Sequence, residues 1–186
     1  DYDAEFRYDR EPIGAIQGLD PERVLYAGTA SKTLAPGLRL GWMAAPRALS
    51  ERLARAKVAA DYGSGVMDQL ALAELIEQGQ LDRHLRHLRH LYRGRRDALL
   101  GGLARHLPEV EPLGASAGLH VMARLPAGVD EAEVVRRAAN DGIGIAGAAE
   151  TYVLDGPPGL VFGYGSIDER RVQAAIQGVR RALHAA

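Results

Sequence analysis

The feature that most constrains this chain is a polar, lysine-bearing loop between two apolar stretches. RVLYAGT at residues 23–29 predicts a short buried strand, and LRLGWMAAP at residues 38–46 predicts a second strand that ends at Pro46. The segment between them, SKTLAPG, is polar and contains proline and glycine, which favours a loop. Lys32 is therefore predicted to lie on a loop between two strands.

The pattern becomes helical after Pro46. PRALSERLARAK carries its proline near a predicted helix start, where proline is well tolerated. Apolar residues then recur at helical spacing in two further segments, the second of which continues to Pro108 with arginine and histidine on its opposite side. The apolar positions are Met67, Leu70, Leu75 and Ile76, followed by Leu81, Leu85, Leu88, Tyr92, Leu99 and Leu103. We expect the long second helix to bridge two lobes.

Beyond Pro108 the predicted strands and helices alternate. Strand patterns occur in GLHVMARLP, GIGIAG and GLVFGY, and helical patterns at residues 130–140 and 168–183. This order predicts a small α+β domain at residues 108–186, after a first domain at residues 1–107 that ends with the bridging helix.

Composition excludes several functional classes. The chain has 186 residues, 47% of them apolar, and a formal net charge of -1, which suits a globular core and argues against a nucleic-acid-binding module in this segment. Cysteine is absent, which excludes disulfides and thiolate metal sites. No apolar run approaches the roughly 20 residues of a membrane span, and DYDAEFRYDREP is too polar for a signal peptide. We expect a cytoplasmic protein without a membrane partner.

Two patterns resemble nucleotide-binding motifs but lack the required context. Gly142, Gly144 and Gly147 spell G-x-G-x-x-G, but a dinucleotide site needs a strand before the pattern and a helix after it. Here a predicted helix precedes it, which favours a turn into a strand. In GTASKT, Ser31 stands where a P-loop requires the glycine before its lysine. We predict neither a dinucleotide fold nor nucleotide hydrolysis.

Three histidines, His84, His87 and His90, are spaced by three on the predicted long helix. This spacing suits a shared metal ion less well than an i, i+4 pair, and we predict no metal site. We interpret the three side chains as part of the solvated basic face of an amphipathic helix. The HLRHLRHLYRGRR run could also attract phosphates.

The residues around Lys32 suit Schiff-base chemistry with a phosphorylated ligand. A lysine used in this way must be held near the ligand and kept partly out of water, so that its neutral amine is available. Hydroxyl and guanidinium donors for a phosphate lie close in the sequence, at Thr29, Ser31 and Arg39. On composition and spacing alone, a surface lysine in a Pro/Gly loop remains the simpler interpretation.

The amino-acid sequences of several segments show a family resemblance that covers nearly the whole chain. DYDAEFRY, SKTLAPGLRLGW, QLALAELIEQGQLDRHLRHLRHLYRGRRDAL and AGLHVMARLP resemble fold-type I aminotransferases of class I/II, which depend on pyridoxal 5'-phosphate (PLP). The resemblance is closest to the C-terminal aminotransferase-like domain of MocR-type regulators in the GntR superfamily. It implies an α/β fold, in which the C-terminal part of the PLP-binding large domain is followed by the small α+β domain.

The resemblance also implies roles for individual residues. Lys32 matches the lysine that binds PLP covalently and acts in catalysis in the enzymes, and Arg39 matches the arginine that pairs with the PLP phosphate. Thr29 and Ser31 match hydroxyl positions beside that phosphate. Tyr2 matches the tyrosine that hydrogen-bonds the PLP ring oxygen. Domains of this kind usually pair, which implies a homodimer.

Two departures from the family pattern bear on activity. The aspartate that contacts the pyridine nitrogen would fall just before Asp1, so we expect this chain to be part of a longer protein. In GLVFGYGSID, Val161 stands where family members often carry the arginine that grips the substrate carboxylate. Arg124 is a candidate replacement for that arginine.

We therefore predict a PLP-binding effector domain of a MocR-type transcriptional regulator. It would respond to a small amine or amino acid, and DNA would be bound only through an upstream domain outside this chain. The alternative is an active PLP-dependent aminotransferase of class I/II, in which Lys32 is also the general base. A PLP-free scaffold is a third interpretation.

Overall fold

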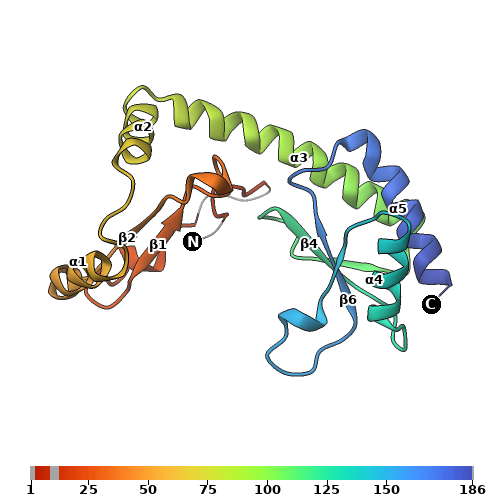
Figure 1. Ribbon diagram of the computed structural model, residues 1–186. Helices are drawn as coiled ribbons and strands as arrows, with labels where there is room; N and C mark the ends of the chain where they lie inside the picture. Colours follow the sequence, from red (N-terminus) through yellow and green to blue (C-terminus); the bar gives the residue numbers. More distant parts are fainter. Residues whose placement is uncertain (1–2, 9–12, 186) are drawn as a thin grey trace. The chain divides into compact units, whose positions relative to one another are not determined.

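The computed structural model describes residues 3–8 and 13–185, and the chain divides into two compact units (Figure 1). Unit 1 comprises residues 1–5 and 10–87, and unit 2 comprises residues 6–9 and 88–186. Helix α3 (Gln80–His106) contributes residues to both.

Unit 1 contains the predicted strand, loop and strand. Strands β1 (Tyr26–Thr29) and β2 (Gly41–Ala44) form an antiparallel pair in which Thr29 faces Gly41. The loop between them contains a short 3-10 helix, η2 (Pro36–Leu38). The prediction that Lys32 lies between two strands is confirmed, although both strands are shorter than the apolar runs suggested. The prediction that the first strand is buried is wrong, because the residues of β1 are half-buried or exposed, and those of β2 are exposed.

Two complete helices follow β2 in unit 1. Helix α1 (Arg47–Asp61) begins directly after Pro46 and ends where Tyr62 adopts a left-handed conformation, with its N–H bonded to the Val58 carbonyl. Helix α2 (Val66–Glu77) follows, and η1 (Ile16–Gly18) precedes β1. In the described part of the chain, no helix combines the length and apolar character of a membrane-spanning segment.

Unit 2 is built on a four-stranded antiparallel sheet with the order β3-β4-β6-β5. Its strands are β3 (Glu111–Leu113), β4 (His120–Arg124), β5 (Ala146–Gly147) and β6 (Gly159–Gly163). Helix α4 (Glu131–Asn140) follows β4, η3 (Ala149–Thr151) follows β5, and α5 (Glu169–His184) follows β6. The predicted strands and helices of this region are confirmed, and β3 is an additional strand.

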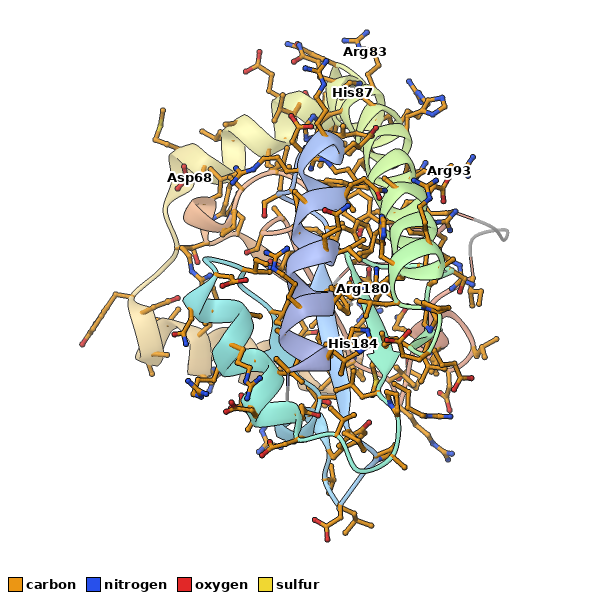
Figure 2. All side chains as sticks on the ribbon, turned by 90° about the vertical axis from the view of Figure 1, so that its right-hand side faces the viewer. Asp68, Arg83, His87, Arg93, Arg180 and His184 are labelled. Carbon is orange, nitrogen blue, oxygen red and sulfur yellow. The ribbon has the colours of Figure 1, made fainter. Side chains whose placement is uncertain are left out.

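The core of unit 2 lies between one face of this sheet and the helices. Alternate residues of β4 and β6 are buried on that face, including Val121 and Leu160. Helix α5 runs between α3 and α4 (Figure 2). A Cβ added at Gly102 of α3 would lie 2.2 Å from Cδ1 of Ile176 of α5, so the glycine permits this close approach.

The segment at residues 6–8 is anchored in unit 2. The backbone of Arg7 forms an isolated antiparallel β-bridge with that of Ala117, and Phe6 is fully buried. The Tyr8 hydroxyl donates to the Gly118 carbonyl at 2.8 Å. The Arg96 guanidinium lies 4.8 Å from the centre of the Tyr8 ring, in a cation–π contact.

The G-x-G-x-x-G pattern forms a turn between a helix and a strand, as predicted. Gly142 follows α4 with φ of 73°, a conformation that favours glycine. Gly147 then pairs with Leu160 in the sheet, and the short η3 follows. A dinucleotide motif would continue into a helix directly after the pattern.

Candidate functional site

Lys32 lies in a tight turn directly after β1. The turn comprises residues 30–34 and is closed by a hydrogen bond of 2.9 Å from the Leu34 N–H to the Ala30 carbonyl; we call it the Lys32 turn. Its start is fixed to the far end of the loop by the Ala30 N–H, which donates to the Leu40 carbonyl at 3.0 Å. Lys32 itself is half-buried. Lys32 therefore lies on a turn that follows β1 and is held by two backbone hydrogen bonds.

The two predicted phosphate-side hydroxyls lie together beside the lysine. The oxygens Thr29 Oγ1 and Ser31 Oγ are 3.0 Å apart, and Thr29 Oγ1 also accepts the Ser31 N–H at 3.1 Å. Thr29 Oγ1 is 3.1 Å from the Leu40 carbonyl oxygen. Because Thr29 has one hydroxyl proton, it donates either to the Leu40 carbonyl or to Ser31 Oγ, and in the second arrangement the Ser31 proton is available to another acceptor.

Arg39 supplies a guanidinium at the end of the same loop. It follows η2 in a left-handed conformation with φ of 50°, which is uncommon for a residue with a side chain. The neighbouring Leu40 carbonyl accepts the Ala30 N–H and lies within hydrogen-bond distance of the Thr29 hydroxyl. Arg39 is exposed and forms no hydrogen bond or ion pair with the described residues. Its charge is therefore available to an anion.

His84 is a residue of this region that sequence reasoning misassigned. Its Nε2 lies 2.9 Å from the carbonyl oxygen of Thr33, which directly follows Lys32. The prediction of a solvated face holds for the exposed His87 and His90 but is wrong for His84, which is half-buried. A signal was present in the sequence, because His84 falls at helical spacing with Leu81 and Leu88 on the apolar stripe.

The remaining predicted positions lie elsewhere. Tyr2 is outside the described residues. In unit 2, Val161 is a half-buried residue of β6 that pairs with Met122. Arg124 pairs with Gly159 at one end of the two strands, two pairs from Val161, and its guanidinium lies 2.8 Å from a carboxylate oxygen of Glu111. The Arg124 guanidinium is therefore already engaged, in an exposed ion pair that is weak enough to exchange.

The Lys32 loop (residues 30–40), together with Thr29, presents a donor set that fits PLP. The set contains an amine, which matches an aldehyde, and two adjacent hydroxyls with the exposed Arg39 guanidinium, which match a phosphate dianion. For the described residues, no group of three histidine, aspartate or glutamate side chains could hold a metal ion.

Comparison with known proteins gives matches along the chain. Residues 4–157 match the family of class I and II aminotransferases. An uncharacterized HTH-type transcriptional regulator of Bacillus subtilis, YhdI, is 37% identical over 185 residues, 98% of this chain and 39% of that protein. The probable rhizopine catabolism regulatory protein MocR of Rhizobium meliloti is 31% identical over 186 residues, 98% of this chain and 38% of that protein. The chain thus spans about two fifths of these regulators.

A solved aminotransferase has the same fold over the full chain. The α-aminoadipate aminotransferase LysN of Thermus thermophilus, in complex with N-(5'-phosphopyridoxyl)-L-leucine, matches with a TM-score of 0.90 and 26% identity. The match covers 100% of this chain and 49% of that one. The chain is therefore similar to regulatory proteins along its sequence and to an aminotransferase in its fold.

Proposed function

This chain belongs to the family of class I and II aminotransferases, and we propose that it is the PLP-binding effector part of a MocR-type transcriptional regulator. The observation that carries the proposal is the similarity to two such regulators over 98% of the chain. In this proposal DNA is bound by a part of the protein outside the chain, and a small amine or amino acid is the signal. PLP, when bound, supplies an aldehyde for covalent attachment of amines and a ring that withdraws electrons.

The chain's own residues have distinct tasks in this proposal. Lys32 would bind the PLP aldehyde covalently. Arg39, Thr29 and Ser31 would hold the phosphate, since they offer charge-assisted and hydroxyl hydrogen bonds on one loop. The role of Tyr2 beside the ring oxygen stays a prediction. We also propose the division into a large-domain part at residues 1–107 and a small domain at residues 108–186, and a homodimer.

The alternative is an active aminotransferase, which the similarity to LysN supports. Val161 favours the regulator, because it places an apolar side chain where the enzymes often carry the carboxylate-binding arginine. A charge-assisted hydrogen bond contributes about 1.5–3 kcal/mol, so its loss weakens the binding of an α-carboxylate. Arg124 would have to leave Glu111 to replace that arginine.

The cofactor proposal is tested by trapping PLP on the full-length protein with borohydride and mapping the labelled lysine. The chain contains two lysines, Lys32 and Lys57, and Lys57 lies on α1 in contact with Asp61. We expect the label on Lys32, its loss from this chain in the Lys32→Ala variant, and no change in Lys57→Ala. An absence of visible PLP absorbance in the wild-type protein would contradict the proposal.

The choice between regulator and enzyme needs a second measurement on the full-length protein. A regulator should bind operator DNA in a ligand-dependent way without turning over an amino donor. Turnover that disappears in the Lys32→Ala variant would favour the enzyme. The Val161→Arg variant sharpens the test, because a restored guanidinium should tighten the binding of amino acids more than of amines that lack the carboxylate.

A further inference from the structure

We propose that His84 is a positioning residue that fixes the Lys32 turn through its hydrogen bond to the Thr33 carbonyl. Its meaning for cofactor binding rests on the proposed function of the Lys32 loop. The positioning itself is a property of the chain without cofactor, and it can be measured separately.

The geometry defines the state of the His84 ring. Nε2 of His84 lies 2.9 Å from the Thr33 oxygen. A carbonyl oxygen only accepts hydrogen bonds, so Nε2 carries the proton and donates it. Nδ1 is then free of a proton in the neutral ring. The imidazole acts here as a fixed donor and needs no positive charge to do so.

The acceptor belongs to the residue that directly follows Lys32. Thr33 is 5% exposed, and its hydroxyl lies 3.5 Å from the Ala30 carbonyl within the same turn. A carbonyl of so buried a residue is poorly supplied with replacement water when its partner is lost. The orientation of the Thr33 carbonyl is coupled to the backbone torsions next to Lys32. The His84 bond therefore restrains the direction from which the lysine leaves the turn.

The hydrogen bond from His84 differs from the other hydrogen bonds of the turn because its donor lies outside the Lys32 loop. The bonds from Ala30 to Leu40 and from Leu34 to Ala30 join residues inside the Lys32 loop. His84 comes from α3, 51 residues after Thr33. It therefore ties the turn to a separate helix, whereas the local bonds allow the loop to move as one piece. A restraint of this kind pre-organises a site before a ligand binds.

The sequence supplies matched controls on the same helix. His87 and His90 follow His84 at intervals of three, are exposed, and form no hydrogen bond or ion pair with the described residues. Figure 2 labels His87 with Arg83 near the start of α3. Replacing these histidines changes the composition of the same helix by the same side chain but leaves the Thr33 carbonyl partnered.

The test compares His84→Gln with His84→Asn in the full-length protein. The glutamine amide nitrogen can reach the place of Nε2, whereas asparagine is one methylene too short. The first readout is amide hydrogen exchange in the Lys32 loop without PLP. We expect three- to tenfold faster exchange in His84→Asn, about the loss of one hydrogen bond, and near wild-type exchange in His84→Gln. His87→Asn and His90→Asn should match the wild type.

The second readout is the affinity for PLP, followed by its visible absorbance. We expect His84→Asn to bind PLP about three- to tenfold more weakly, and His84→Gln to bind nearly as the wild type does. If His84→Asn resembles His87→Asn in loop exchange, or if glutamine fails to restore it, the positioning role is overturned. If the wild-type protein binds no PLP, the proposed function fails, while the exchange measurement still decides the role of His84. Should His84→Asn not fold, a folded His84→Gln with faster loop exchange also overturns the proposal.

Discussion

The two units of this chain differ in how many of their large apolar side chains are buried. Unit 2 holds a cluster of buried residues that includes Phe6, Leu103 and Ile176. The described part of unit 1 buries Ala30, Thr33 and Pro46 and leaves many large apolar side chains exposed. These exposed residues are Ile13, Ile16, Leu19, Leu25, Trp42, Met43, Leu49, Val58, Tyr62, Val66, Met67, Leu70 and Ile76. Surfaces this apolar are usually covered by another protein surface, so we expect the unit that carries the Lys32 loop to be the one more often covered by a partner surface.

The helices of the two units differ in the same direction. Asp130 and Asp168 cap α4 and α5 in unit 2, because each side chain accepts a backbone N–H of the first turn. In unit 1, α1 and α2 begin after Pro46 and Gly65 without a side-chain cap. Unit 2 thus contains its own stabilising contacts. For unit 1 we expect a larger share of the stabilising contacts to be made with surfaces outside the described residues.

Truncating a core leucine should give the largest contrast between the units. Leu103 on α3 is fully buried in unit 2, whereas Leu70 on α2 is 59% exposed in unit 1. We expect Leu103→Ala to lower the free energy of local unfolding of unit 2 by about 2–5 kcal/mol, and Leu70→Ala to change stability by less than about 0.5 kcal/mol. Amide hydrogen exchange along α3, α5 and α2 measures both. An equal cost for Leu70→Ala would mean that its surface is covered in the protein.

Removing a helix cap should have the next largest effect. The Asp130 carboxylate accepts the Glu133 N–H at 3.1 Å, and we expect Asp130→Ala to destabilise α4 by about 0.5–2 kcal/mol. Asp68 is the comparison in unit 1, since it lies in the first turn of α2 without capping it. Its replacement by alanine should cost about 0.3–1 kcal/mol or less, through the helix dipole alone. Exchange rates of the first-turn amides of each helix distinguish the two, and equal losses would refute the capping account.

Local sequence patterns predicted most of the fold because most helices and strands carry their own signal. The loop of SKTLAPG is polar and broken by Pro36 and Gly37, and α3 follows a regular leucine stripe. Strand β3 was not predicted, because it has three residues, one of them Pro112, and exists through its pairing with β4. The placement of residues 6–8 in unit 2 likewise depends on Ala117 and Gly118, which are far away in the sequence.

The candidate site was predictable where it is contiguous. Thr29, Ser31 and Lys32 lie within four positions, so a hairpin loop brings them together. The position of His84 on the apolar stripe of α3 indicates its partial burial, but its partner, the Thr33 carbonyl, is 51 residues away and carries no side-chain signature. Backbone acceptors leave no trace in the sequence, so contacts of this kind become visible only in the folded chain.

Removing the buried Tyr8 hydroxyl tests how much its hydrogen bond contributes to holding residues 6–8 in unit 2. Tyr8 is 5% exposed and donates to Gly118, and phenylalanine would keep the ring and its contact with Arg96. We expect Tyr8→Phe to cost about 0.5–1.5 kcal/mol, because the Gly118 carbonyl keeps the Tyr164 hydroxyl as a donor. Tyr62→Phe is the control in unit 1, since Tyr62 is 93% exposed and should tolerate the change. Amide hydrogen exchange of the Gly118 N–H measures the effect. Faster exchange in Tyr8→Phe alone supports the attachment of residues 6–8 to unit 2, and equal exchange in both variants refutes it.

Surface charge should distinguish the units least. In unit 2, hydrogen bonds from Arg136 and Arg137 lower the pKa of Glu133 to about 2, and in unit 1 a hydrogen bond from Lys57 lowers the pKa of Asp61. A carboxyl whose pKa is depressed by folding adds stability above its unfolded pKa, here 4.5 for Glu133, and loses it as the pH falls towards 2. Both units should therefore lose a small contribution in acid. Carbon-13 titration of the Glu133 carboxyl should show its pKa rising towards 4.5 in Arg136→Gln, and an unchanged value would mean that the bond from Arg136 does not persist in solution.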